Sequence, residues 1–294
     1  MEGQPRLSWP TVVERAAEIA ESYEEGLQLT VRQLYYRLVA EHAIPHKQSY
    51  YSSLTAQLAK ARRAGNFPSH RIVDHTRAIH RPDAWRSPAD FMRDMAKKYE
   101  RDLTVGQEQA LYVAAEKDTL RGLMLNWLSP YGVPVLVLRG QASQTYVDLV
   151  AKDIKEDGRE SVMLYIGDFD ASGTAIDQSF WERADCIDNF DRIALNAEDV
   201  LRYNLLAAPG KLTDNNFARF RKDPNNFYDA ICRRQRLDPT KAWQWEVEAM
   251  EPETLRAKVI AEVEPYINFD TLAEVIRQER VEQEKLRTFI DTWK

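Results

Sequence analysis

Between about residue 108 and residue 205, short runs of almost uninterrupted apolar residues alternate with segments whose apolar residues recur at helical spacing. Near-continuous apolar runs are typical of strands that are buried on both faces. A chain that alternates strand and helix in this way is expected to form a parallel sheet with helices on both faces. The predicted strands cover residues 110–114, 134–138, 162–166 and 192–195, and the predicted helices cover residues 118–128, 143–155, 174–184 and 197–205.

The first 74 residues carry a different pattern, with three short amphipathic segments and then a basic extended piece at residues 71–74. The second segment begins after Thr30, because Thr30 and Gln33 have the spacing of a capping box. This order is typical of a winged helix-turn-helix module whose third helix reads a DNA groove, although trihelical units also occur as packing modules. The predicted helices cover residues 11–25, a stretch that starts after Thr30, and residues 49–64.

The two patterns predict an α/β protein of two domains. We expect a winged-helix domain over residues 1–105 and a Rossmann-like parallel-sheet domain over residues 106–294, with a helical C-terminal extension. Residues 211–294 are expected to be mostly helical, ending in a helix over residues 268–294.

Composition excludes several classes of protein. No apolar run approaches the roughly 18 residues that a membrane span needs, and the start of the chain lacks the pattern of a signal peptide. Two cysteines, Cys186 and Cys232, form neither a disulfide framework nor a cysteine-based zinc site. We therefore expect a cytoplasmic protein that does not associate with membranes.

Charge is distributed unevenly along the chain, whose net charge is −6. Residues 30–98 carry thirteen Lys or Arg against five Asp or Glu, a net charge of +8. A basic block in an acidic chain is typical of a surface that faces phosphates, although it also fits a surface that pairs with the acidic remainder. The expected nucleic-acid contacts are Lys60, Arg62, Arg63, Arg71 and Lys117.

Three carboxylates follow predicted strands. Glu116 comes after the first strand, and Asp168 and Asp170 come after the third. Ligands of open α/β sheets bind beyond the carboxyl ends of the strands, and residues two apart in an extended chain point to the same side. Because oxygen-only ligation suits Mg²⁺, we expect these residues to bind it; the alternative is a set of solvated carboxylates that cap the following helices.

Two adjacent tyrosines lie on the second predicted helix. Tyr35 falls in its apolar stripe, whereas Tyr36 falls outside it, with Arg32 one turn earlier on the same face. An exposed phenol beside a guanidinium has the chemistry to attack a phosphodiester. An ordinary, partly exposed aromatic residue is the alternative.

Four motifs in this order resemble the A subunits of topoisomerase VI, a family that includes the meiotic double-strand-break proteins. The segment Thr30-Val31-Arg32-Gln33-Leu34-Tyr35-Tyr36 resembles the catalytic-tyrosine motif of the family's winged-helix domain, and Glu116 with Asp168-Phe169-Asp170 resembles the acidic signature of its Toprim domain. The other two similar segments are residues 193–205 and 245–250.

The resemblance implies a mechanism. Tyr36 would attack a phosphodiester of double-stranded DNA, Mg²⁺ on Glu116, Asp168 and Asp170 would stabilise the transition state, Arg32 would hold the scissile phosphate and Lys117 would assist. It also implies a nucleoid-associated homodimer, in which the tyrosine of one protomer meets the metal site of the other and both strands are cut.

The chain also departs from this family. Only 29 residues precede Thr30, which leaves no arm to dock an ATPase B subunit, and the sequence has no Walker-type loop. We therefore expect no intrinsic ATPase and no B-subunit partner, as in the compact Mini-A relatives. Two other functions remain open, a Toprim nuclease that uses water as the nucleophile and a winged-helix DNA-binding protein without catalysis.

Overall fold

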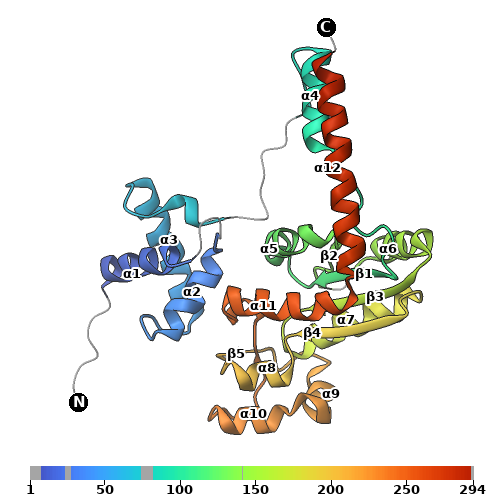
Figure 1. The fold of residues 1–294 in the computed structure, drawn as a ribbon. Helices are drawn as coiled ribbons and strands as arrows, with labels where there is room; N and C mark the ends of the chain where they lie inside the picture. The colour runs from blue at the N-terminus through green and yellow to red at the C-terminus, as the bar shows by residue number, and fades with distance from the viewer. Residues whose placement is uncertain (1–7, 24–27, 74–81, 141, 293–294) are drawn as a thin grey trace.

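The computed structural model describes residues 8–23, 28–73, 82–140 and 142–292. Over these residues the chain is a mixed α/β protein with twelve α-helices and one four-stranded parallel sheet (Figure 1). The prediction of an α/β fold with a parallel sheet is therefore confirmed.

The sheet has the strand order β2-β1-β3-β4, and every neighbouring pair is parallel. All four strands were predicted, with ends that differ by a few residues. The central strands β1 and β3 run in register, with Ala115 opposite Ile166, so the residues that follow them meet at one edge. The strands are β1 (Gln109–Ala115), β2 (Val135–Val137), β3 (Glu160–Ile166) and β4 (Asn189–Ala194).

Helices cover both faces of this sheet, as the apolar runs predict. Alternate residues of β1 divide between two cores: Leu111 and Val113 belong to one, and Tyr112 and Ala114 belong to the other. The first core also contains residues of α5, α8 and α11, and the second contains residues of α6 and α7. The helices that follow the strands are α5 (Asp118–Leu128), α6 (Gln144–Asp157), α7 (Ala171–Ala184) and α8 (Ala197–Arg202).

The N-terminal module (residues 8–73) has its own core, built by α1 (Trp9–Glu21), α2 (Val31–Ala40) and α3 (Gln48–Arg63). The capping box is present, since Thr30 Oγ1 accepts from the Gln33 amide and Gln33 Oε1 accepts from the Thr30 amide. After α3, the 3₁₀ turn η1 (Ser69–Arg71) leads to Ile72, which pairs with Leu29. Asp74, the last residue of the predicted extended piece, lies outside the described residues.

The C-terminal part is mostly helical, as predicted. It also contains a small antiparallel pair, β5 (Ala208–Pro209) with β6 (Trp243–Gln244). The α-helices are α9 (Phe217–Lys222), α10 (Tyr228–Arg234), α11 (Pro252–Val263) and α12 (Phe269–Asp291), and the remaining 3₁₀ turns are η2 (Ser129–Tyr131), η3 (Pro224–Asn226), η4 (Val247–Ala249) and η5 (Glu264–Tyr266). We refer to residues 109–292 as the sheet domain.

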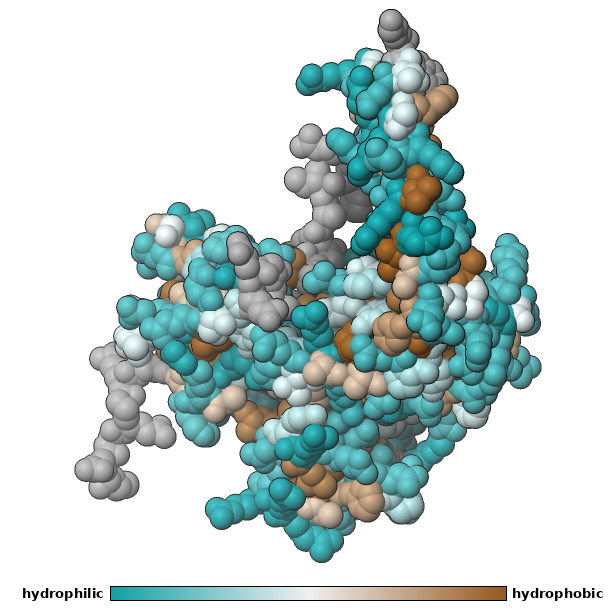
Figure 2. Space-filling model, viewed as in Figure 1, coloured by the Kyte–Doolittle hydropathy of each residue, from teal (hydrophilic) through white to brown (hydrophobic). Residues whose placement is uncertain are grey.

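Helix α4 (Pro88–Lys98), which the sequence analysis does not predict, packs against α12 (Figure 1). The Tyr99 hydroxyl donates to Glu282 at 2.6 Å, and the Arg101 guanidinium pairs with Glu282 at 2.7 Å. Residues 88–101, placed with the N-terminal domain by the predicted boundary at residue 105, thus contact the C-terminal helix. Among the described residues, no helix combines the length and the apolar character of a membrane span, and the face in Figure 2 is largely hydrophilic.

Candidate functional site

Helix α2 attaches the N-terminal module to the sheet domain. Arg32 Nε donates to Glu246 Oε2 at 2.7 Å, and Arg32 Nη2 donates to Glu246 Oε1. One turn later, Arg37 Nη2 donates to the carbonyl oxygen of Ala249. The Ala249 side chain is buried in the core of the N-terminal module, so η4 of the sheet domain completes that core.

The position of Tyr36 differs from the prediction. We expected an exposed phenol, but the side chain is only 4% exposed, the same as that of Tyr35. The expectation was wrong because the face of α2 that carries Tyr36 is covered by the sheet domain, which the periodicity of one helix cannot show. Tyr36 lines a small cavity of about 180 Å³ that Leu206 and Met250 also line.

The surroundings of Tyr36 keep its hydroxyl protonated. Burial raises the pKa of Tyr36, and the nearby Glu246 carboxylate raises it further through its charge and a hydrogen bond. Arg32 and Lys117 act in the opposite direction without overcoming these effects. The ring of His46 lies 5.6 Å from the Tyr36 ring, centroid to centroid, and burial lowers the pKa of this imidazole. A phenol placed here needs a proton acceptor before it can act as a nucleophile.

Lys117 is surrounded by carboxylates at the carboxyl end of β1. Its Nζ atom lies 2.6 Å from Asp168 Oδ2, 3.2 Å from Glu246 Oε2 and 3.6 Å from Glu248 Oε2. Burial alone would lower the pKa of Lys117, but these three carboxylates outweigh that effect and raise it. For Glu246 the signs are reversed: burial alone would raise its pKa, but the charges of Lys117 and Arg32 outweigh that effect and lower it. Lys117 and Glu246 therefore remain an ionised pair.

The structure brings Glu116, Asp168 and Asp170 to one edge of the sheet, beyond β1 and β3. Glu116 Oε2 accepts from the Asp168 amide at 2.8 Å, and Asp168 Oδ1 accepts from the Val247 amide at 2.9 Å. Asp170 is the N-cap of α7, where its Oδ1 accepts from the Gly173 amide at 2.7 Å. Each carboxylate thus already has a partner in the protein.

Within the described ranges, no three Asp, Glu, His or Cys side chains gather closely enough to hold a metal ion. The donor set nevertheless fits Mg²⁺, which prefers carboxylate oxygens. Burial, followed by the charge of Asp168, raises the pKa of Glu116 to about 7, although the nearby Lys117 ammonium acts in the opposite direction. A cation bound here would balance that charge, and it would compete with Lys117 for Asp168.

Two glycines make room for this arrangement. A Cβ on Gly167 would lie 2.6 Å from the Tyr165 hydroxyl and 2.8 Å from Glu116 Oε2, and a Cβ on Gly173 would lie 2.4 Å from the Asp168 carbonyl oxygen. Neither glycine has a left-handed φ. They are needed for close approach, not for unusual backbone angles.

Sequence reasoning missed three residues of the site. Glu246 and Glu248 are only 4% and 2% exposed, although both are acidic. Arg192 donates from Nη1 to the carbonyl oxygens of Gly167, Asp168 and Leu195 and from Nε to an aspartate of α7. For the two glutamates a signal exists, since they alternate with apolar residues in the short segment 245–250.

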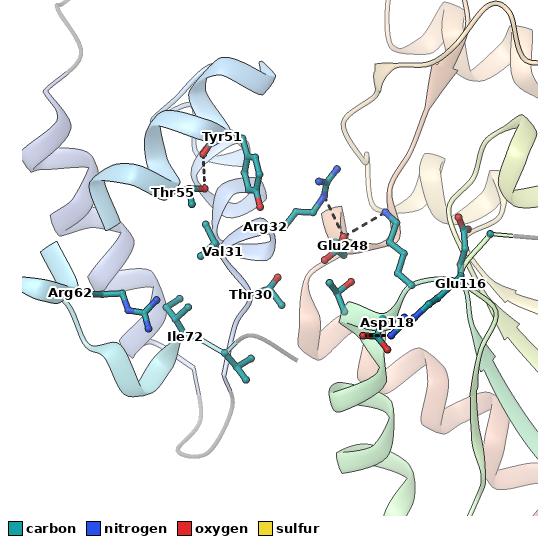
Figure 3. A pocket seen from close by; sticks show the side chains of 15 residues that line it. Thr30, Val31, Arg32, Tyr51, Thr55, Arg62, Ile72, Glu116, Asp118 and Glu248 are labelled. Carbon is teal, nitrogen blue, oxygen red and sulfur yellow. Dashed lines mark hydrogen bonds and ion pairs between the residues drawn. The ribbon is translucent and has the colours of Figure 1, made fainter. Parts of the chain in front are cut away.

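A cavity of about 840 Å³ lies between the N-terminal module and the sheet domain (Figure 3). Arg62 of α3 and Arg32 of α2 reach it from one side, and Lys117 and Arg139 reach it from the other. The other polar side chains in its wall are those of Thr30, Thr55, Tyr51, Thr119, Glu116, Asp118 and Glu248. The wall thus combines four cationic side chains with hydroxyls and three carboxylates, and Arg139 pairs with Asp118 at 2.8 Å.

The other predicted nucleic-acid contacts lie elsewhere. Lys60 lines a separate groove beside Trp9. Arg63 is exposed at the end of α3. Arg71 Nε pairs with Glu21 Oε2 at 3.1 Å. Of the five predicted contacts, the structure thus gathers Arg62 and Lys117 into one cavity and does not bring the other three to it.

The site therefore combines the buried phenol and the bidentate guanidinium of the N-terminal module with an ammonium and five carboxylates of the sheet domain. Such a set has the groups needed for phosphoryl transfer, namely a nucleophile, phosphate-binding cations and cation-binding oxygens. In comparisons with known proteins, no protein-family model matches this chain and no curated protein is significantly similar to it.

Proposed function

We propose that this chain is a Mg²⁺-dependent DNA-cleaving enzyme of the topoisomerase VI A-subunit type, with Tyr36 as the nucleophile. The proposal includes a winged-helix identity for the N-terminal module, a Toprim identity for the sheet domain, and action as a nucleoid-associated homodimer on double-stranded DNA. One observation carries it: Arg32, on the same helix as Tyr36, is joined through Glu246 to Lys117 and Asp168 of the acidic edge.

The cavity supports DNA as the substrate. Its cationic side chains come from both parts of the chain, and Arg and Lys are the usual ligands of phosphate groups. The positive charge of residues 30–98 adds the long-range attraction that DNA-binding proteins use.

The chain's own residues account for the proposed step. The Tyr36 oxygen attacks a backbone phosphorus, the bond from phosphorus to the sugar oxygen breaks, and a tyrosyl phosphodiester forms. Glu246, which faces the hydroxyl, accepts the phenolic proton. Lys117 protonates the leaving sugar oxygen, and Arg32 holds the phosphate. When bound, Mg²⁺ on Glu116, Asp168 and Asp170 supplies charge stabilisation for the phosphate oxygens.

A second function is favoured by the burial of Tyr36. A phenol that is 4% exposed, with a raised pKa, is a poor nucleophile as it stands. Hydrolysis by water at the same acidic edge would not need it. This candidate keeps the carboxylates and the phosphate-binding cations and removes the covalent intermediate.

Incubation with supercoiled plasmid and Mg²⁺, followed by denaturing separation, tests both functions. The proposal expects broken DNA with covalently attached protein, lost in Tyr36→Phe and in Asp168→Asn. Tyr35→Phe is the matched control, since Tyr35 is equally exposed to solvent, at 4%, and its hydroxyl donates to the Lys47 carbonyl oxygen at 3.2 Å. Cleavage without attached protein in Tyr36→Phe would establish the hydrolytic function. If the wild-type chain leaves the plasmid intact, both cleavage functions fail and only DNA binding without catalysis remains as a function.

A further inference from the structure

Arg32, which the proposed function assigns to the scissile phosphate, is already bound to anions of its own chain. Its guanidinium contacts both oxygens of Glu246, and its Nε lies 3.4 Å from Glu248 Oε2. A carboxylate held by two parallel N–H groups has nearly the same geometry as a phosphate held by arginine. The Glu246 carboxylate thus stands where a phosphate would bind.

On the sheet-domain side, the same two carboxylates also occupy Lys117. Its Nζ atom contacts Glu246 and Glu248 as well as Asp168. The two cations therefore share the same two carboxylates, and Figure 3 shows the contact of one of them, Glu248, with Arg32. With both glutamates in place, neither cation has its charge available to a ligand in the cavity.

Glu248 is not fully satisfied in this position. Its side chain is 2% exposed, and its Oε1 atom has no hydrogen-bond partner among the described residues. A buried carboxylate oxygen without a partner has a free-energy cost. The Glu248 carboxylate would therefore be more stable if it left this buried position and reached solvent. Such a cost is expected where the contact of Glu248 with Arg32 and Lys117 has to break during function.

We infer that Glu246 and Glu248 are internal phosphate mimics that keep the DNA-binding cavity closed until a DNA phosphate displaces them from Arg32 and Lys117. This inference rests on the proposed function, since it concerns regulation of the same site. Displacement frees α2 from Glu246 while the glutamate stays beside the Tyr36 hydroxyl. Opening of the site and deprotonation of the nucleophile would thereby depend on one carboxylate.

Binding of a fluorescein-labelled DNA duplex to the full chain tests this inference, measured by anisotropy in EDTA so that cleavage does not contribute. The variant is Glu246→Gln/Glu248→Gln. The matched control is Glu253→Gln/Glu262→Gln, which removes the same charge from exposed positions of α11. We expect the first variant to bind about tenfold more tightly than the control. Its salt dependence should also be steeper, by roughly 1.8 in the logarithmic slope, because two more cations then meet DNA phosphates.

A second variant separates release of the cations from general charge repulsion. Glu246→Asp/Glu248→Asp keeps the charge but shortens both side chains, so it weakens their contacts with Arg32 and Lys117. We expect an affinity between those of the wild-type chain and the glutamine variant. This variant also supplies the test if the glutamine variant does not fold, as judged by circular dichroism.

The outcomes distinguish this inference from the proposed function. If the wild-type chain binds the duplex and neither site variant binds more tightly than the control, the two glutamates are structural and the inference fails alone. If no form of the chain binds DNA, the proposed function fails and the inference fails with it.

Discussion

Glu116 is a carboxylate whose protonation should change the stability of the folded chain near neutral pH. Its pKa is raised to about 7, whereas an unfolded glutamate titrates near 4.3. The folded state therefore binds the proton more tightly, and the stability this provides is lost as the pH rises through 7. In urea unfolding with EDTA, we expect the wild-type chain to lose stability between pH 5 and pH 8 relative to Glu116→Gln. Parallel pH profiles would contradict this.

Gly173 gives a prediction about space at the same edge. A Cβ there would lie 2.4 Å from the Asp168 carbonyl oxygen, which is backbone and cannot move aside cheaply. We expect Gly173→Ala to lower the free energy of unfolding by roughly 3 kcal/mol. Gly158→Ala is the control, because Gly158 has open space and only a left-handed φ, which costs about 1 kcal/mol. Equal losses in urea titrations would show that the acidic loop can adjust.

At the scale of elements, the capping box at the start of α2 should measurably stabilise the N-terminal module. Thr30 is buried and bonds reciprocally with Gln33. We expect Thr30→Ala to cost about 1 kcal/mol of stability. Thr55→Ala, an exposed change within α3, should cost less than about 0.5 kcal/mol. Thermal unfolding followed by circular dichroism compares the two, and equal changes would mean that the cap contributes nothing.

The positions of the helices and strands were also the part of the structure that the sequence predicted best. The helix predicted at residues 118–128 is α5, and the four apolar runs are the four strands, because burial on both faces leaves a strong local pattern. Helix α4 was missed, since its stability depends on contacts with α12, nearly two hundred residues later. The carboxylates after β1 and β3 could be predicted because the carboxyl ends of parallel strands lie at the same edge of a sheet.

For the whole molecule, the decisive contact lies between α2 and η4, and no local pattern contains it. Periodicity placed Tyr36 on the surface of one helix, and only the arrival of Ala249 and its neighbours buries that face. Glu246 and Glu248 became site residues for the same reason. Acidic residues are usually predicted to be exposed to solvent. These two are buried because Arg32 and Lys117, which are distant in the sequence, pair with them.

This contact gives a prediction about cooperativity. Ala249 is buried in the core of the N-terminal module but belongs to the sheet domain. An arginine there would meet Arg37, whose guanidinium bonds to the Ala249 carbonyl oxygen. We expect Ala249→Arg to split thermal unfolding into two calorimetric transitions, because each part keeps its own core. A single transition at a lower temperature would show that the N-terminal module does not fold without the sheet domain.

The groups that meet around Lys117 are contributed by residues 32, 117, 168 and 246. A chain still being synthesised lacks the last of these until residue 246 has been added, more than two hundred residues after Arg32. An unfinished or prematurely terminated copy would hold the tyrosine helix and the acidic loops without the segment that joins them. Under the proposed function, any capacity to break a chromosome would therefore arise together with the carboxylates that we infer restrain it.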